Sequence, residues 1–526
     1  MRLVVSLLAL LLVGAPALAQ PARPNIVFLL ADDHAAHALS AYRQHLAYGA
    51  KLPATPNLDR LAASGMLFTN AFVTNSICGP SRATVLTGQY GHLNGVMTND
   101  TPLHPTHTNF PALLRDAGYR TALFGKWHLH ERPTTAFDHY EMLPGQGTYY
   151  NPRLFSETGD TVRYTGYTND IITDRAIGWM RTEARARRPF MLMLTFNAPH
   201  RYWEPGPAQL GLLRDTALAE PPTLFDEGEG RAFRRRDAEM TIAEDLFARD
   251  LKLEAPPNLT PEQRAAWDSS YARENAAYAS LDSTSTAATR WKYQRFIADY
   301  MRAVLALDAA AGRVLDAIDA AGLARNTVVV YASDQGFFLG DHGWFDKRWM
   351  YEESLRTPLL VRWPGVTLPG AVNRDLAMNL DLAQTFLEIA GVRAPESMQG
   401  RSLVPLLRGR TPADWRTAIY YQYHAYPDWH MVQRQYGVRT QRYKLIHYYE
   451  VGRWELFDLA RDPDELRSVY DDPQYAGVLD EMRERLAALR RQYAAPDVDP
   501  APHREFTAPP GLRRPPAARP AGQGGR

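Results

Sequence analysis

Four oxygen-bearing side chains come directly after two short apolar runs of the chain. Asp32 and Asp33 follow one run, and Asp334 and Gln335 follow the other. Runs of this kind are typical of strands buried on both faces of a parallel sheet, and such sheets bind ligands beyond the carboxyl ends of their strands. The two pairs could therefore converge on one hard cation, because such a cation prefers oxygen ligands. Each pair on its own also fits a turn or a helix cap.

The single cysteine of the chain lies in a pentapeptide that suits the start of a helix. The pentapeptide is Cys78-Gly-Pro-Ser-Arg82, and proline is favoured in a first helical turn. The N-terminus of a helix attracts anions, and Arg82 would point back to the same place. The pattern predicts an anion site beside a potential sulfur nucleophile. A cysteine hydrolase would also need a base, and no arrangement of the histidines singles one out.

Composition excludes several classes of protein. The chain has 526 residues, with 59 Lys and Arg against 58 Asp and Glu, which gives a net charge of +1. A protein that binds nucleic acid through bulk charge should be markedly basic, so we expect no nucleic-acid partner. Hydrophobic residues make up 45% and charged residues 22%, which excludes disorder over most of the length. One cysteine permits neither an intramolecular disulfide nor a cysteine-cluster metal site.

The first residues have the pattern of a cleaved export signal. Arg2 is followed by an apolar run that reaches Val13, and Ala17-Leu-Ala19 is a cleavage site of small residues. The run is far shorter than the roughly 20 apolar residues that a membrane-spanning helix needs. We predict a signal peptide over 1–19, cleavage after Ala19, and a periplasmic or secreted protein without a membrane span.

Apolar runs that alternate with helical patterns predict the fold class. We expect a long helix over 291–321 and buried strands at 25–31, 66–72, 120–124, 190–196, 327–331 and 359–363. This alternation predicts an α/β fold, in which a large, mostly parallel sheet is sandwiched by helices. The interval 205–289 is polar and irregular, and we interpret it as an insertion between two core strands.

The pattern changes after about residue 410. Four short strands and a helix follow one another, which predicts a smaller C-terminal α+β unit with an antiparallel sheet over 411–495. The larger domain would then cover 20–410. The last stretch, 496–526, is rich in proline and glycine and predicts a disordered tail.

Several motifs together resemble those of the type I sulfatases. In the order of that family they are Asp32-Asp33 after the first strand, Cys78-Gly-Pro-Ser-Arg82 with Leu-Thr-Gly88, Gly-Lys126-Trp-His128, Ala-Pro-His200, and Ser-Asp334-Gln335-Gly with Gly-Asp-His-Gly and Lys347. The resemblance covers residues 24–475 and implies an alkaline-phosphatase-like fold. The chain departs from many sulfatases at Gln335, where they carry asparagine, although an amide oxygen is still offered.

The resemblance implies one metal site and one modified residue. Asp32, Asp33, Asp334 and Gln335 would bind one divalent cation, by resemblance Ca²⁺, with residue 78 as a further ligand. Cys78 would be converted to Cα-formylglycine by a formylglycine-generating enzyme before export. Its aldehyde would hydrate, and one hydroxyl, activated by the metal, would attack sulfur in line.

The same resemblance implies roles for charged and titratable side chains. Lys126 and Lys347 would neutralise the sulfate oxygens. His200 would protonate the leaving alcohol, and His128 would take a proton from the second hydroxyl of the modified residue so that sulfate is expelled. Arg82 would hold the hydrated aldehyde.

The resemblance as a whole implies an exported sulfatase, with a sulfated small molecule or glycan as its substrate. The runs 32–42, 75–82 and 143–150 resemble bacterial enzymes that act on N-acetylglucosamine 6-sulfate in glycosaminoglycans or mucins. Two alternatives stay open at this point. One is a phosphonate monoester hydrolase or phosphodiesterase with the same fold, and the other is a protein that binds sulfated glycans without turnover.

Three further groups of residues carry weaker signals. His34 and His37 follow the first aspartate pair, and they either line a pocket or pack on a loop. Asp341 and His342 are expected to support the pocket rather than to take part in chemistry. The segment 421–430 is dense in aromatic residues and histidine, and we interpret it as inter-domain packing rather than as a substrate contact.

Overall fold

The computed structural model describes residues 23–46 and 52–497. The predicted signal peptide, 1–19, lies outside the described residues, and so does nearly all of the predicted tail, 496–526. Both therefore stay predictions, as do the domain boundaries. Within the part of the chain that is described, no helix is long and apolar enough to cross a membrane.

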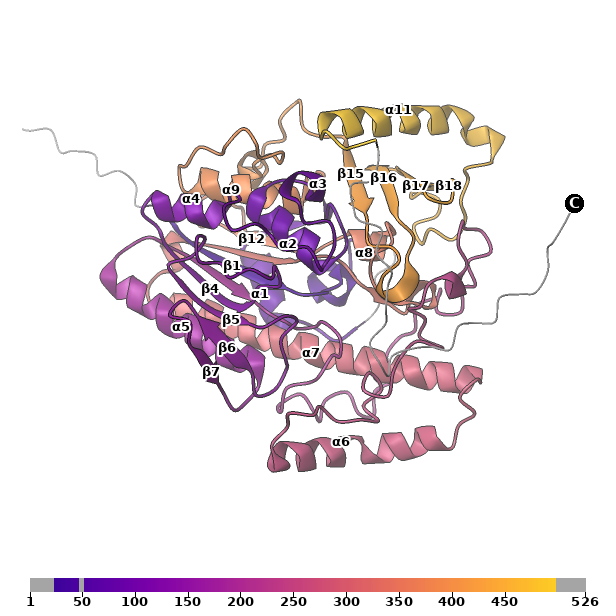
Figure 1. Ribbon diagram of the computed structural model, residues 1–526, viewed down its shortest axis with the longest axis horizontal. Helices are drawn as coiled ribbons and strands as arrows, with labels where there is room; N and C mark the ends of the chain where they lie inside the picture. The colour runs from indigo at the N-terminus through magenta and orange to yellow at the C-terminus, as the bar shows by residue number, and fades with distance from the viewer. Residues whose placement is uncertain (1–22, 47–51, 498–526) are drawn as a thin grey trace, which may run out of the picture.

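A ten-stranded sheet with a parallel centre forms the core of the molecule (Figure 1). The neighbouring strands of this centre are β9 (Thr327–Ser333), β1 (Asn25–Ala31), β8 (Phe190–Thr195), β4 (Arg120–Lys126) and β5 (His139–Leu143). Towards one edge follow β12 (Leu359–Arg362), β2 (Met66–Phe68) and β13 (Ala371–Asn373), and towards the other β6 (Arg153–Ser156) and β7 (Thr161–Arg163). Pairing becomes antiparallel at β12 and at β6, so the mostly parallel sheet that we predicted is confirmed at its centre and is mixed towards its edges.

Strand β1 is buried on both faces, as its unbroken apolar sequence requires. Val27 and Leu29 pack on one face against α1 (Pro56–Ser64), α5 (Thr168–Ala186) and α7 (Thr286–Ala320). Phe28 and Leu30 pack on the other face against α2 (Cys78–Thr87), α4 (Phe110–Asp116) and α9 (Leu382–Ile389). Figure 1 shows α5 and α7 below the sheet and α2, α4 and α9 above it, so helices cover each face.

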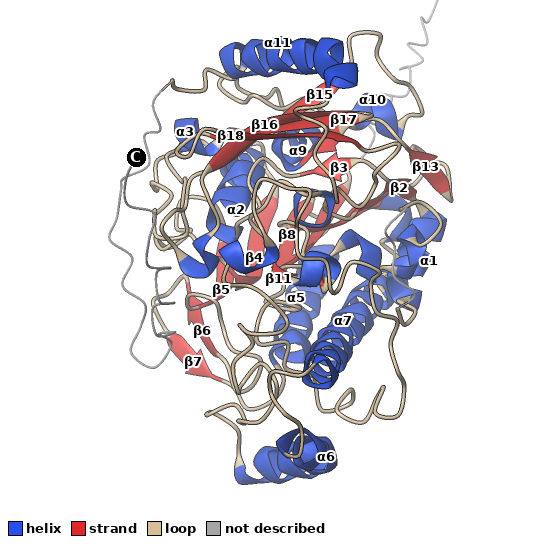
Figure 2. Cartoon of the chain, turned by 90° about the vertical axis from the view of Figure 1, so that its right-hand side faces the viewer, coloured by secondary structure: helices blue, strands red, loops and turns tan. Residues whose placement is uncertain are grey.

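A second, four-stranded antiparallel sheet lies beside the first. Its strands are β15 (Ala418–Tyr423), β16 (Gln435–Thr440), β17 (Tyr443–Tyr448) and β18 (Arg453–Asp458). Helix α11 (Ala476–Gln492) lies over this sheet (Figure 2). The predicted fold class, a large α/β sheet between helices with a smaller antiparallel unit, is confirmed.

The segment between β8 and α7 is more regular than we expected from its sequence. It contains helix α6 (Pro261–Ala279), which the sequence analysis missed. Thr260 and Gln263 form a capping box at its start, with proline in the first turn, and this signal could have found the helix. Helix α7 also begins before the predicted residue 291, because the Ser285 side chain caps it.

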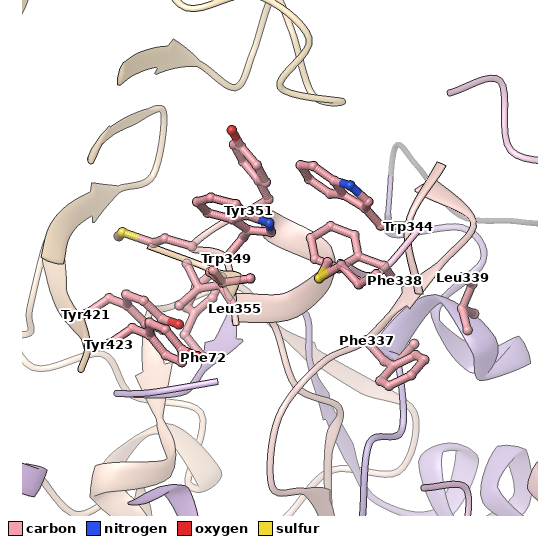
Figure 3. Packing of buried hydrophobic residues seen from close by; sticks show 14 of the residues in the cluster. Phe72, Phe337, Phe338, Leu339, Trp344, Trp349, Tyr351, Leu355, Tyr421 and Tyr423 are labelled. Carbon is pink, nitrogen blue, oxygen red and sulfur yellow. The ribbon is translucent and has the colours of Figure 1, made fainter. Parts of the chain in front are cut away.

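Aromatic side chains join the two sheets (Figure 3). Trp344, Trp349 and Tyr351 come from the segment after β9, and Tyr421 and Tyr423 come from β15. The rings of Trp344 and Tyr351 stack with their centroids 5.9 Å apart. Large aromatic rings bury much apolar surface, so this cluster holds the small sheet against the large one.

Glu352 is the centre of a buried ion network between the two sheets. Its carboxylate accepts a hydrogen bond from Arg439 of β16 at 3.1 Å, and it pairs with Lys444 of β17 at 3.0 Å. Arg356 is a third partner. Burial raises the pKa of Glu352, but these positive charges outweigh burial and hold the pKa well below its usual range. The small sheet is therefore fixed by charge as well as by aromatic packing.

We expect Glu352→Gln to destabilise the protein, because it leaves Arg439 buried without a carboxylate partner. Breaking a buried ion pair in this way costs about 3–5 kcal/mol. The control is Asp268→Asn, which removes one partner of an exposed ion pair with Arg264 and should cost less than about 1 kcal/mol. Thermal unfolding followed by circular dichroism compares the two variants. Equal melting temperatures would contradict the role of Glu352.

Candidate active site

The residues predicted at the strand ends lie together at one edge of the large sheet. Ala31 of β1 is paired with Ser333 of β9, so the segments that follow these two strands leave the sheet side by side. Asp32, Asp33 and Asp334 follow these strands and are completely buried, and we call them the acidic cluster. One carboxylate oxygen of each lies within 4.8 Å of the others. The register of two parallel strands is what assembles this cluster.

The acidic cluster and Gln335 offer the donors that a hard cation needs. Gln335 Oε1 is buried, and among the described residues it has no hydrogen-bond partner. Its Nε2 group contacts Asp33 Oδ1. Burial and the negative charge of Asp32 raise the pKa of Asp334 well above its usual value. An unsatisfied buried oxygen beside three carboxylates would be stabilised by a divalent cation, so these residues fit one.

Three positive side chains each pair with one carboxylate of the acidic cluster. The pairs are Lys126 with Asp32, Lys347 with Asp33 at 2.6 Å, and Arg82 with Asp334 at 2.9 Å. Burial raises the pKa of Asp32, but the positive charges around it, with Lys126 the strongest, together outweigh burial and hold the pKa well below its usual range. The structure thus brings these predicted side chains to the same place.

Cys78 is the first residue of α2 and faces the acidic cluster. Its Sγ donates to Asp32 Oδ1 at 3.3 Å, and only 1% of the residue is exposed. Burial and Asp32 raise the pKa of the thiol well above its usual value, so the encoded cysteine is a poor nucleophile. Arg82, one turn later, donates to Asp334 and to the Lys126 carbonyl, each at 2.9 Å. It therefore ties the helix to the ends of β9 and β4.

Both predicted histidines line one cavity. His200 Nδ1 donates to the Arg201 carbonyl at 2.8 Å, which leaves Nε2 facing Asp33 Oδ2 at 3.8 Å. Burial and the charge of Lys126 lower the pKa of His200 to about 4. The same two causes lower the pKa of His128 well below its usual value. Both rings are therefore neutral at pH 7 when no ligand is bound.

The cavity that these histidines line has a volume of about 1020 Å³. Pockets of roughly 300–1,000 Å³ are typical of small-molecule sites, so there is room for at least one sugar unit. Lys347 also lines it. Because Lys347 and His200 both lie against Asp33, the acidic cluster is directly behind the cavity wall.

Several separate parts of the chain form the cavity walls. They include the loop 144–148 after β5, Arg201 and Arg249 between β8 and α6, and the segment 424–430 after β15. The last part corrects our interpretation of 421–430 as inter-domain packing. Tyr421 and Tyr423 do pack between the sheets (Figure 3), but 424–430 line the cavity.

The histidines that follow the first aspartate pair do not line the cavity. His34 Nδ1 contacts the Tyr331 hydroxyl, and His37 Nε2 lies 3.2 Å from Asp341 Oδ2. His342 is buried and contacts the ring of Trp344. Of the two alternatives for His34 and His37, the structure supports packing.

Sequence reasoning missed other residues of the cavity wall. Asp346 and Arg348 flank Lys347 and form an ion pair with each other at 3.1 Å. The sequence offered no indication of their role except that they are neighbours of the motif residue Lys347. Gln146 contacts Lys126 and lies between Gly145 and Gly147. A polar residue enclosed by two glycines could have indicated a turn that presents a side chain.

The large mixed sheet with an acidic cluster at its strand ends, beside a smaller antiparallel sheet, is an alkaline-phosphatase-like fold. Residues 24–392 match the family model described as "Sulfatase", and residues 340–492 match the model described as "N-sulphoglucosamine sulphohydrolase, C-terminal". The chain therefore belongs to the sulfatase family and is a sulfuric ester hydrolase.

Similar proteins agree with this family. The N-acetylglucosamine-6-O-sulfatase of Bacteroides thetaiotaomicron is 42% identical over 499 residues, which span 91% of this chain and 88% of the relative. A solved structure in complex with its substrate D-glucosamine-2-N,6-O-disulfate aligns with a TM-score of 0.87 and 42% identity, over 90% of this chain and 99% of that one. The phosphonate monoester hydrolase of Agrobacterium radiobacter aligns at 21% identity and a TM-score of 0.65, over 90% of this chain and 96% of that one, a likeness of fold alone.

Proposed function

We propose that this sulfatase removes the 6-sulfate of a glucosamine unit, such as N-acetylglucosamine 6-sulfate in a glycosaminoglycan or mucin glycan. The observation that carries the proposal is the 42% identity to an N-acetylglucosamine-6-O-sulfatase over 91% of this chain. The similar structure bound to D-glucosamine-2-N,6-O-disulfate supports the same sugar. Asp346, Arg348 and His430 make a polar part of the cavity wall that suits the hydroxyls of a sugar.

The proposal includes one divalent cation, Ca²⁺. It would be held by the acidic cluster together with Gln335 and residue 78, since an all-oxygen site favours a hard ion. When bound, the cation would supply Lewis-acid chemistry to oxygen atoms at this site. Lys126 and Lys347 would hold the remaining sulfate oxygens, because both ammonium groups lie at the acidic cluster beside the cavity.

The proposal also includes conversion of Cys78 to Cα-formylglycine by a formylglycine-generating enzyme, before export through the signal peptide 1–19. A buried thiol with a raised pKa is a poor nucleophile, which supports a modified residue at this place. The hydrated aldehyde supplies an oxygen nucleophile instead. Arg82 positions the helix that presents residue 78, and neutral His128 can accept a proton there.

His200 is the proposed general acid for the leaving alcohol. Its Nδ1 proton is held by the Arg201 carbonyl, so the transferable proton must be on Nε2. Burial and the charge of Lys126 lower the pKa of His200 to about 4, and a bound sulfate ester would offset that charge and raise the pKa. The protonated ring is the active form, so turnover of alkyl sulfates should fall as the pH rises through the pKa of His200 in the complex.

The substrate proposal predicts a clear preference in a panel of sulfated sugars. Enzyme from its own host should release sulfate from N-acetylglucosamine 6-sulfate about 10²-fold faster than from the 3-sulfate, with little turnover of phosphonate esters.

A peptide spanning residue 78 should be about 18 Da lighter than encoded, as expected when a thiol becomes an aldehyde. Ion chromatography and mass spectrometry give the two readouts, and Cys78→Ala should be folded but inactive. Equal release from both sugars, or the encoded mass alone, would contradict the proposal.

We expect Asp334→Ala to weaken binding of the cation. A ligand that binds only the folded state stabilises it, by about 2.7 kcal/mol at one hundred times its dissociation constant. Added calcium should therefore raise the melting temperature of the variant less than that of the unmutated protein. The control is Asp316→Ala, at an exposed carboxylate that pairs with Arg60, which should keep the full rise. The same rise in all three proteins would argue against the site.

Replacement of the two histidines should separate their roles. His200→Ala should slow alkyl sulfates by about 10²–10⁴-fold and nitrophenyl sulfate far less, because nitrophenolate leaves without a proton. In His200→Ala, the turnover of alkyl sulfates should also no longer fall as the pH rises. His128→Ala is the comparison, and it should slow both substrates alike, because its proton transfer follows departure of the alcohol. If His200→Ala slows both substrates to the same extent, it is not the general acid.

A further inference from the structure

Gln146, to which the sequence motifs gave no role of its own, contacts one of the proposed sulfate-binding lysines. Lys126 is completely buried, and its Nζ contacts Asp32 Oδ2 and Gln146 Oε1. Gln146 lines the cavity and is exposed to it. The side-chain amide therefore lies between a buried ammonium group and the space in which a substrate binds.

The loop that carries Gln146 has a defined shape. Gly145 and Gly147 on either side have φ angles of +52° and +77°, in the left-handed region that favours glycine. A side chain on Gly147 would also meet the side chain of Leu143, 2.9 Å away. The Tyr149 hydroxyl donates to the backbone carbonyl of His200 at 2.6 Å. The loop is thus fastened to the backbone of His200 by Tyr149 and contacts Lys126 through Gln146.

The contact with Lys126 decides how the amide of Gln146 is oriented. An ammonium group has only donors, so the amide oxygen must face it. The Nε2 group of Gln146 then keeps both of its N–H donors available, because within residues 23–46 and 52–497 it has no hydrogen-bond partner. An anion oxygen that accepts a hydrogen bond from Lys126 inside the cavity would lie next to these donors.

We propose that Gln146 is a further catalytic residue of this sulfatase. Its Oε1 accepts from the ammonium group of Lys126, and its Nε2 donates a hydrogen bond to an oxygen of the sulfate group. This inference rests on the proposed sulfate-binding role of Lys126. A donor fixed in advance stabilises an anionic group. A glutamate at this position would keep the contact with the lysine but present a negative charge to sulfate, so the amide has a chemical role that a carboxylate cannot fill.

Inorganic sulfate, used as a competitive inhibitor, tests this contact without any sugar. Gln146→Ala removes one hydrogen bond to a charged group, and should raise the inhibition constant of sulfate by about 10- to 100-fold. Gln146→Glu should raise it by about 100-fold or more, because like charges then face each other. Gln146→Asn keeps the amide on a shorter side chain and should behave like Gln146→Ala. The value of kcat/KM for nitrophenyl sulfate should fall in the same order.

The matched control is Gln474→Glu, which makes the same change of charge at an exposed position near α11 and should change neither value. Melting temperatures equal to that of the unmutated protein exclude misfolding. A sulfate inhibition constant that changes less than about threefold in Gln146→Glu would overturn the proposal. So would an effect of Gln146→Ala confined to sugar substrates, since Gln146 would then contact the sugar. Sulfate and nitrophenyl sulfate contain no sugar, so failure of the proposed sugar specificity would leave this test intact.

Discussion

A balance of buried charge at the carboxyl edge of the large sheet is the interaction on which the rest of the structure depends. The three carboxylates of the acidic cluster are completely buried, and burial of such groups is unfavourable unless each is paired. The partners Arg82, Lys126 and Lys347 come from α2, from β4 and from the segment after β9. Displacing any one of these elements would leave a charge without its partner, so strand register, helix and loop are fixed together.

The cavity in front of the acidic cluster depends in turn on regions far apart in the chain. Arg201 directly follows His200 in the chain and donates a hydrogen bond to Asp250 of the insertion at 2.7 Å. The Arg201 guanidinium also lies over the ring of Phe247, 4.6 Å from its centroid. The insertion therefore holds the backbone that carries His200. The segment 424–430 reaches the cavity only because the small sheet is docked by its aromatic and ionic contacts. The site is complete when all three regions have packed.

Features with a local signature could be predicted from the sequence, and features that arise from packing could not. β1 and β9 are unbroken apolar runs, so their ends, and the acidic cluster that follows them, were expected at one edge of the sheet. Helix α6 was missed because it buries little apart from Trp267 and Tyr271, so it shows almost no apolar periodicity. The place of 424–430 in the cavity wall depends on how the second sheet docks, which residue spacing does not encode.

The burial of Cys78 implies that its proposed conversion to formylglycine would have to precede folding. Every residue of α2, from Cys78 to Thr87, is buried. A modifying enzyme needs access to its target residue and to the neighbours by which it recognises it, and the folded protein withholds this whole segment. Folding and the proposed modification would therefore compete for the same stretch of chain. A molecule that folds first would keep its thiol for as long as it stays folded.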